Sequence, residues 1–243
     1  MSELVNNEAR PLAVVTGGTK GIGRAILRRF AAGGFDVVTT ARHGSDLETL
    51  RQDTESAFPG CRVFILTADL GSREDVDRFA AFVSSLGRPV DFLVNNTGVF
   101  LPGQVHNEEE GTFETIMQVN VASAYHLTRA LVGGMISRKK GYIVNVCSTA
   151  SITAYTNGGS YCISKYALLG MTKVLREELK THQVKVTAIL PGATFTDSWA
   201  GTDLPESRFM APEDVAELLW TCYHLSPSAV VEEILVRPQL GDL

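Results

Sequence analysis

An α/β fold with a doubly wound parallel sheet is predicted for this sequence by three observations. Apolar runs of strand length alternate with longer segments of helical period along all 243 residues. The runs are rich in Val, Ile, Leu and Phe, which is typical of strands buried on both faces of a parallel sheet. No internal repeat, low-complexity tract or linker interrupts the alternation, so 1–243 is expected to form a single domain.

The elements follow one another in a regular order. The strand candidates are 12–17 (LAVVTG), 36–41 (DVVTTA), 62–68 (RVFILTA), 90–96 (VDFLVNN), 141–148 (GYIVNVCS), 184–190 (VKVTAIL) and 232–237 (EEILVR). The helix candidates are 22–32, 46–57, 73–86, 112–137, 160–182 and 212–224. Ser72 and Asp75 suit a capping box at the start of the third helix. Such alternation implies right-handed βαβ units, with helices on both faces of the sheet.

Composition narrows the class of protein. A net charge of −5 argues against a nucleic-acid partner, because phosphate affinity needs a broad basic surface. No segment has the roughly 18 apolar residues of a membrane span, and the amino terminus lacks a signal-peptide pattern, so a cytoplasmic protein is expected. The cysteines lack CxxC spacing and the histidines lack HExxH spacing, so neither a disulfide framework nor a metal site is expected. The acidic run 108–110 is expected to be a solvated loop or the start of a helix.

A glycine-rich turn, TGGTKGIG at 16–23, joins the first strand to the first helix. Gly17, Gly21 and Gly23 allow a tight turn and close approach of the backbone to a pyrophosphate, which would lie at the amino end of the helix. Glycine-rich turns are often only turns. Here strand, turn, helix and strand come in the order that a nucleotide site requires, which favours nucleotide binding.

Further motifs follow along the chain. They are NNTG at 95–98, Asn120, Ser148, YCISK at 161–165 and PGATFT at 191–196. Together with TGGTKGIG they resemble, in order and spacing, the motifs of the short-chain dehydrogenase/reductase family over about 11–196. The resemblance implies a Rossmann fold, a nicotinamide cofactor, and reduction of a carbonyl or oxidation of an alcohol.

Tyr161 and Lys165 lie four residues apart on a predicted helix and therefore share one of its faces. A free phenol has a pKa of about 10, and a nearby cation favours phenolate, so Lys165 is expected to promote proton transfer by Tyr161. In the family the lysine also holds the nicotinamide ribose. An isolated YxxxK would more simply be a packed tyrosine and a solvated lysine. Ser148, at a strand end thirteen residues earlier, favours catalysis.

Ser148 carries a hydroxyl that can donate to a substrate oxygen as charge develops there. Thr149 and Ser151 compete for this role, and the family's spacing selects Ser148. Asn120 matches the family asparagine that completes a proton relay through water to the lysine. Its structural alternative is a helix-bending amide satisfied by backbone. The expected reaction is hydride transfer to a carbonyl carbon, with Tyr161 protonating the oxygen.

The end of the second strand indicates which nicotinamide cofactor is bound. NAD enzymes usually place an acid there for the adenosine ribose, whereas this chain has Ala41 followed by Arg42. Lys20 adds a second cation, so NADPH with its 2′-phosphate is expected. Arg42 could instead be an ordinary surface residue.

The resemblance implies further cofactor contacts. They are assigned to Thr19, Ile22, Asp69, Leu70, Asn96, Gly98, Pro191, Gly192, Thr194 and Thr196. Asp69 could equally serve the entry to the third helix. Thr97 departs from the family, which usually has alanine at this position of the motif.

Substrate choice depends on 193–211, which is expected to form a lid over the site. The lid carries Phe195, Trp199, Phe209 and Met210, which could stack on a flat ring or simply pack the lid. YCISK, PGATFTDSW, FMAPEDVAE and the ending VVEEILVRPQLGDL are similar to bacterial sepiapterin reductases within the family. That similarity implies a pterin carbonyl substrate, contacted by Ser148, Tyr161 and Trp199.

Two alternatives remain. Within the family, the substrate could be a 3-oxoacyl thioester or a small ketone or diketone. A different class would be a non-catalytic NADPH-binding redox sensor, against which the four catalytic-type residues argue. The family also implies a homodimer or homotetramer built from the long fourth and fifth helices, although core helices show the same apolar pattern.

Overall fold

A computed structural model describes residues 10–199 and 201–242. Its centre is a parallel sheet of seven strands in the order β3-β2-β1-β4-β5-β6-β7. The strands are β1 (Leu12–Thr16), β2 (Asp36–Ala41), β3 (Val63–Thr67), β4 (Val90–Asn95), β5 (Gly141–Val146), β6 (Val184–Pro191) and β7 (Glu233–Val236). The predicted doubly wound sheet is confirmed, and each strand lies within two residues of its expected limits.

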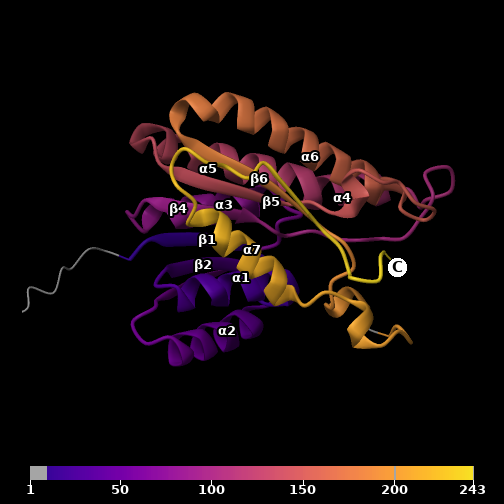
Figure 1. Ribbon diagram of the computed structural model, residues 1–243, viewed down its shortest axis with the longest axis horizontal. Helices are drawn as coiled ribbons and strands as arrows, with labels where there is room; N and C mark the ends of the chain where they lie inside the picture. Colours follow the sequence, from indigo (N-terminus) through magenta and orange to yellow (C-terminus); the bar gives the residue numbers. More distant parts are fainter. Residues whose placement is uncertain (1–9, 200, 243) are drawn as a thin grey trace, which may run out of the picture.

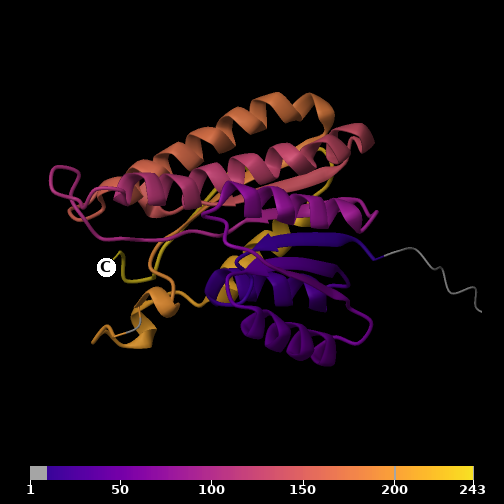
Figure 2. The same ribbon diagram turned by 180° about the vertical axis from the view of Figure 1, so that it is seen from behind.

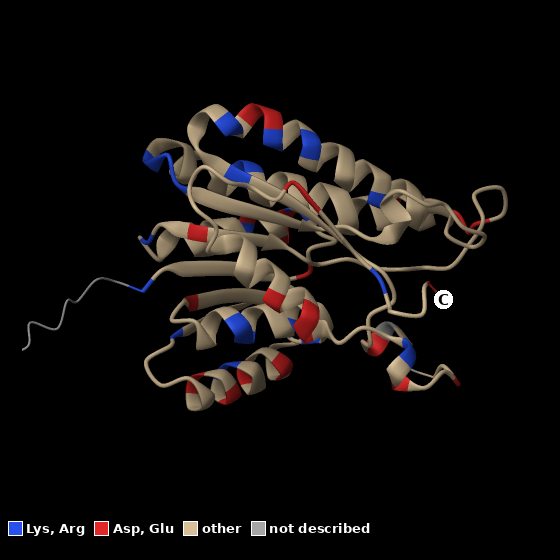
Figure 3. Ribbon diagram, viewed as in Figure 1, with Lys and Arg blue, Asp and Glu red and all other residues tan. Residues whose placement is uncertain are grey.

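Helices cover both faces of the sheet (Figures 1 and 2). On one face lie α1 (Gly21–Ala32), α2 (Gly44–Ala57) and α7 (Pro212–Tyr223). On the other lie α3 (Arg73–Ser85), α4 (Thr112–Met117), α5 (Ser123–Arg138) and α6 (Gly159–Leu179). Charged residues gather on helices and loops, and the strands carry few of them (Figure 3). No helix in the described part of the chain is long and apolar enough to cross a membrane.

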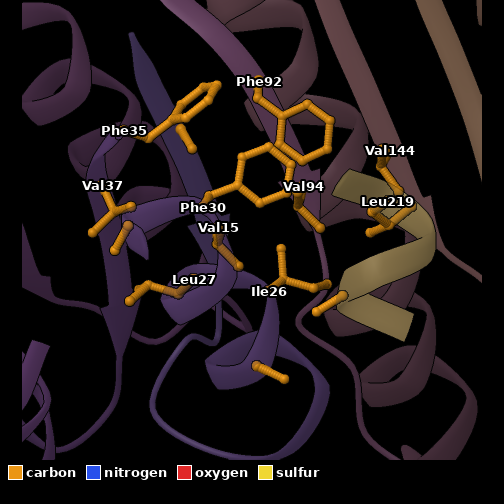
Figure 4. Close-up of a cluster of buried hydrophobic side chains, with 14 of the residues drawn as sticks. Val15, Ile26, Leu27, Phe30, Phe35, Val37, Phe92, Val94, Val144 and Leu219 are labelled. Atoms are coloured by element: carbon orange, nitrogen blue, oxygen red, sulfur yellow. The ribbon is translucent and has the colours of Figure 1, made fainter. Parts of the chain in front are cut away.

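Side chains along each strand alternate between two cores. In β1, Val15 enters the core under α1 and α7, whereas Val14 enters the core under α3 and α5. Phe30 of α1 is central to the first core, where its ring stacks on Phe92 of β4 at 4.3 Å between centroids (Figure 4). Trp220 of α7 meets the same ring edge-on at 5.3 Å. The two helices are therefore joined through one aromatic cluster.

The helix predicted over 112–137 is interrupted. A π-helical segment, Gln118–Ala122, separates α4 from α5. The Asn120 amide in this segment exchanges hydrogen bonds with the backbone of Val99, so a tertiary contact accompanies the wider turn. Such π-bulges are frequent at functional sites.

Two helix ends also differ from expectation. The capping box at α3 is only half formed: Ser72 Oγ accepts from the Asp75 N–H, while the Asp75 carboxylate accepts from the Asp69 N–H instead. The helix predicted over 160–182 ends as α6 at Leu179 and continues as the 3₁₀ turn Lys180–His182.

The strand order reverses between β1 and β4. The chain runs outward from β1 to β3 and then returns to place β4 on the other side of β1. The loops after these two strands diverge to opposite faces, and ligands of such sheets bind in the crevice that this opens at the carboxyl ends. The glycine-rich turn and the NNTG motif follow β1 and β4, so both lie at this crevice.

Candidate active site

The glycine-rich turn forms one wall of the crevice. Gly21 begins α1 with a φ of +51°, which favours glycine. A Cβ atom on Gly23 would collide with the carbonyl oxygen of Gly17, so the turn folds tightly on the helix. Thr39 of β2 accepts from the Gly18 N–H at 3.0 Å and donates to Val15 at 2.7 Å. This rigid turn presents the free N–H groups of a helix amino terminus, which suit a pyrophosphate.

The motif after β4 supports the same turn. The Asn96 amide donates to the carbonyl oxygens of Thr16 and Gly17, at 2.9 and 3.2 Å. Thr97 donates its N–H to Thr16 Oγ1 at 3.0 Å. Asn96 is therefore a support of the glycine-rich turn, and its direct contact with a cofactor stays a prediction. The hydroxyl of Thr97 borders Gly17 without disturbing the fold.

Two cations lie just beyond the carboxyl ends of the neighbouring strands β1 and β2. Arg42 directly follows β2 and is exposed, and its guanidinium has no ion pair among the described residues. Lys20 pairs instead with Asp197, in the segment 193–211 that is expected to form a lid, with Nζ and Oδ2 2.9 Å apart. The hydrogen bond that Lys20 donates to the Asp197 carboxylate raises the pKa of Lys20 above its usual value. Both side chains could meet a 2′-phosphate.

The loop after β3 is organised by Asp69. Its carboxylate accepts from the Gly71 N–H at 2.9 Å, and its own N–H is held by Asp75. These contacts shape the entry to α3, the structural alternative for Asp69. Leu70 is buried in the core under α3. An adenine contact from either residue stays a prediction.

The loop after β6 extends from the carboxyl end of that strand to the glycine-rich turn. Pro191 ends the strand, and the Gly192 N–H donates to Val236 at 2.7 Å. Thr194 is buried and donates to the Gly192 carbonyl at 3.1 Å. A Cβ atom on Gly21 would lie 2.8 Å from Cγ2 of Thr196. The structure therefore places the PGATFT segment, 191–196, against the glycine-rich turn, 16–23.

The remaining two assignments to the glycine-rich turn, Thr19 and Ile22, are both half-buried. Ile22 is partly buried against the core under α1, so its side chain supports the helix. Thr19 lies in the turn itself and is partly exposed. Cofactor contacts from these two residues stay predictions.

Ser148 lies just beyond β5 and caps a short 3₁₀ turn, Thr149–Ser151. Its Oγ accepts from the Ala150 N–H at 3.1 Å. Because a hydroxyl carries one hydrogen as well as lone pairs, this bond leaves the hydrogen free to donate to a substrate oxygen. Ser151 is buried and its hydroxyl accepts from the Ser148 N–H, so it supports Ser148 and does not compete with it.

Tyr161 lies in the first turn of α6 and Lys165 in the second. The Lys165 side chain is buried, and its Nζ donates to the Val146 carbonyl at 2.9 Å. The same Nζ lies 5.7 Å from the centroid of the Tyr161 ring. The helix thus places phenol and ammonium on one face, as the four-residue spacing predicts.

Asn120 joins this group from the π-helical segment. Its amide bonds Val99 in both directions and donates to Ser164 Oγ at 3.0 Å. A Cβ atom on Gly98 would lie 3.3 Å from Asn120 Oδ1 and 3.6 Å from Lys165 Nζ. Asn120 therefore fits the helix-bending alternative and also lies beside the lysine.

The lid aromatics pack on one another. Trp199 and Phe195 lie 5.0 and 5.6 Å from the ring of Phe209. Trp199 lines a groove with α1 and the start of α7, and the described lining of that groove includes neither Ser148 nor Tyr161. These aromatic side chains therefore pack on one another, and a contact between Trp199 and substrate stays a prediction.

Phe100 was not foreseen as a site residue. Its ring lies edge-on to Tyr161, with 5.0 Å between centroids, and the side chain is 44% exposed. The sequence offers one indication that Phe100 lies at the site: it is an apolar residue that follows the NNTG motif after β4. It offers an exposed aromatic surface beside Tyr161.

Comparison with known proteins agrees with this geometry. The family model described as short chain dehydrogenase matches residues 11–206. The chain is 32% identical to the sepiapterin reductase of Chlorobaculum tepidum over 240 residues, which cover 96% of this chain and 98% of that protein. It is 30% identical to the NADP-dependent 3-hydroxy acid dehydrogenase YdfG of Salmonella typhi over 239 residues, covering 93% and 94%.

Solved structures are also similar. A metagenomic short-chain oxidoreductase in complex with NADP matches with a TM-score of 0.82 and 31% identity, covering 94% of this chain and 97% of that one. The L-sorbose reductase of Gluconobacter frateurii, complexed with NADPH and L-sorbose, matches with a TM-score of 0.87 and 27% identity, covering 94% and 95%. Motifs, site geometry and these likenesses agree, and the chain belongs to the short-chain dehydrogenase/reductase family of oxidoreductases.

Proposed function

We propose that the protein is an NADPH-dependent carbonyl reductase that acts on the side-chain carbonyl of a pterin such as sepiapterin. The observation that carries the reductase assignment is the grouping of Tyr161, Lys165 and Asn120, whose side chains approach one another at the carboxyl end of β5. Ser148 follows the same strand, with a hydroxyl hydrogen free to donate.

Each residue of this group has a separate role in the proposed reduction. Bound NADPH supplies the hydride that the carbonyl carbon receives. Ser148 donates a hydrogen bond to the carbonyl oxygen and stabilises the negative charge that develops on it. Tyr161 gives that oxygen its proton, so an alcohol forms, and the phenol regains a proton from solvent through Lys165 and Asn120.

The cofactor assignment is supported by charge. Ala41 replaces the acid that would repel a 2′-phosphate, and Arg42 offers an unpaired guanidinium among the described residues. Lys20 adds a second cation once Asp197 releases it. NADP or NADPH is bound in two of the similar structures.

The pterin assignment is supported by two findings. The similarity to the Chlorobaculum tepidum sepiapterin reductase extends over 96% of this chain. The exposed ring of Phe100 beside Tyr161 gives a planar heterocycle an aromatic surface on which to pack. Phe100 is a second candidate for the stacking role, beside Trp199.

A second candidate substrate class is a small 3-oxo acid, thioester, ketone or diketone. It is favoured by the similarity to an NADP-dependent 3-hydroxy acid dehydrogenase over 93% of this chain. A redox sensor that binds NADPH without turnover is the alternative from another class.

We propose that the active form is a homodimer or homotetramer. Partly exposed apolar side chains lie along α4, α5 and α6, namely Phe113, Tyr125, Tyr166 and Val174. Light scattering on the purified protein measures the mass directly, and a monomer at micromolar concentration would contradict the proposal.

The deciding experiment follows NADPH oxidation with sepiapterin, a small diketone and an acetoacetyl thioester, using Tyr161→Phe as the control. Turnover of sepiapterin well above the other two, lost in the variant, is expected. Turnover only of the thioester or the diketone would retain the reductase and reject the pterin. Tight NADPH binding with no turnover of any carbonyl would favour the sensor.

A further inference from the structure

A carboxylate from a distant loop lies at the start of the helix that carries Tyr161. Glu108 belongs to the loop between β4 and α4, in the acidic run 108–110 for which the sequence predicts a solvated loop or the start of a helix. Its Oε1 accepts from the Ser160 N–H at 2.8 Å, and its Oε2 accepts from the Ser160 hydroxyl. In both Figure 1 and Figure 2 this loop lies against the chain that enters α6.

We propose that Glu108 is a positioning residue, which caps the first turn of α6 and thereby fixes Tyr161 for proton transfer. The inference rests on the proposed function, because it assigns Glu108 a part in that reaction. Glu108 acts through Ser160 and Tyr161 and is not itself expected to touch substrate.

The start of α6 needs such a partner. Its N-cap residue, Gly158, has no side chain with which to accept from the free N–H groups of the first turn. A carboxylate satisfies one of these donors and also suits the positive end of the helix dipole. Ser160 directly precedes Tyr161, so the capped donor lies one residue from the catalytic phenol.

Two glycines leave room for the carboxylate. A Cβ atom on Gly159 would occupy the place of Glu108 Oε1, and one on Gly103 would lie 2.6 Å from Glu108 Cγ. The Gly103 N–H donates to the Asn157 carbonyl at 3.1 Å, and the Gln104 amide donates to Asn157 Oδ1 at 3.0 Å. Loop and helix start are therefore joined around the Glu108 side chain.

The other end of the same loop meets the same phenol. Val99 is bonded in both directions to Asn120, and Phe100 packs edge-on against Tyr161. The loop is therefore attached to the start of α6 at two places: Phe100 contacts Tyr161, and Glu108 bonds Ser160. Losing its carboxylate would loosen both the first turn of α6 and the surface that Phe100 presents.

The second turn of α6 is held independently. Lys165 is bonded to Val146 of β5, and Ser164 is bonded to Asn120. Neither contact involves Glu108. Removal of the cap should therefore disturb Tyr161 while leaving the lysine in place, which separates an effect on turnover from one on cofactor binding.

The test compares Glu108→Ala, Glu108→Gln and Glu109→Ala. Glu109 has the same charge in the same loop, is exposed, and makes no side-chain hydrogen bond or ion pair with any described residue. We expect Glu108→Ala to lower kcat about ten-fold or more, since small misplacements of a catalytic group are costly, while the Kd for NADPH changes less than two-fold. Glu108→Gln should recover most of kcat, because its amide oxygen can still accept from Ser160. Glu109→Ala should match the parent.

Amide hydrogen exchange in the cofactor-free protein supplies a readout that needs no substrate. Glu108→Ala should speed exchange at Ser160 and Cys162 and leave the third and later turns unchanged. If the parent protein reduces no carbonyl, the proposed function fails, and exchange alone then decides whether Glu108 holds this turn. Unchanged exchange in Glu108→Ala would overturn the inference. So would a loss of kcat accompanied by an equal loss of NADPH affinity and a lower Tm, which would indicate a general structural role.

Discussion

The Nζ atom of Lys165 lies 5.7 Å from the centre of the Tyr161 ring and is tied to the Val146 carbonyl by a 2.9 Å hydrogen bond. A lysine side chain is normally mobile, whereas this one is buried and anchored to the sheet. The positive charge therefore keeps a constant position relative to the phenol. The sheet, as well as the helix, therefore determines where this charge lies relative to Tyr161.

Tyr161→Phe should remove the proton donor and keep the ring that packs against Phe100. We expect kcat to fall about 100-fold or more, the usual scale for the loss of a general acid, with NADPH affinity retained. Steady-state rates with the best carbonyl of the panel, together with fluorescence titration of NADPH, check this. Turnover near that of the parent would contradict the assignment.

Arg42→Asp should shift the cofactor preference from NADPH toward NADH by ten-fold or more. A charge-assisted hydrogen bond to the 2′-phosphate is lost, and an acid suited to the ribose hydroxyls is gained. The ratio of kcat/KM values for the two cofactors measures the shift. Lys140→Asp is the matched control. Lys140 directly precedes β5, so it lies at the amino ends of the strands, whereas Arg42 lies at their carboxyl ends. An unchanged ratio in Arg42→Asp would reject the role of Arg42.

Asp197→Asn should strengthen NADPH binding about two-fold to five-fold, the scale of an exposed ion pair. Asp197 competes with the 2′-phosphate for Lys20, and its removal frees the ammonium. NADH affinity should stay the same, and the gain should shrink as salt is added. Asp203→Asn, in the same lid but without an ion pair among the described residues, is the control. Weaker NADPH binding in Asp197→Asn would indicate that the pair holds the lid in its working position.

Stability should fall in alkali. Burial raises the pKa of the Cys61 and Cys147 thiols from 9.0 to about 11, and that of Tyr142 from 10.0 to about 12. The folded protein therefore keeps these protons when the unfolded chain has lost them. The free energy of unfolding should be steady up to about pH 8.5 and decrease from about pH 9 upward.

Urea denaturation under reducing conditions between pH 7 and 10.5 measures this decrease. Cys61→Ala should show a shallower loss over the same range, because one of the titrating groups is gone. A free energy that does not change up to pH 10.5 would contradict the burial of these groups.

The sheet could be predicted from the sequence because strands buried on both faces must be apolar, and the seven apolar runs are separated by helical segments. The break in the helix predicted over 112–137 could not. It accompanies the bonds between Asn120 and Val99, which lie 21 residues apart in the chain. Periodicity within a segment carries no information about such a contact.

Some residues of the candidate site could likewise be predicted from the sequence, and others could not. Residues in motifs of defined spacing, such as Ser148 and Tyr161, could be identified because one helix and one strand end place them. Glu108 looked like part of a solvated acidic run, since its partner Ser160 is 52 residues away. Trp199 is predicted to contact substrate because it is aromatic and lies in 193–211. Neither property determines the direction in which its ring packs.

The aromatic cluster around Phe30 has a consequence for synthesis on the ribosome. Phe30 and Phe92 are made early, but Trp220 and Tyr223, which also pack on Phe30, emerge near the end of translation. Until then the nascent chain exposes the apolar face of α1 that packs against α7 in the folded protein, and a chaperone could bind there. Chains stalled before residue 212 should be cut rapidly by protease within α1, and chains released with α7 should resist.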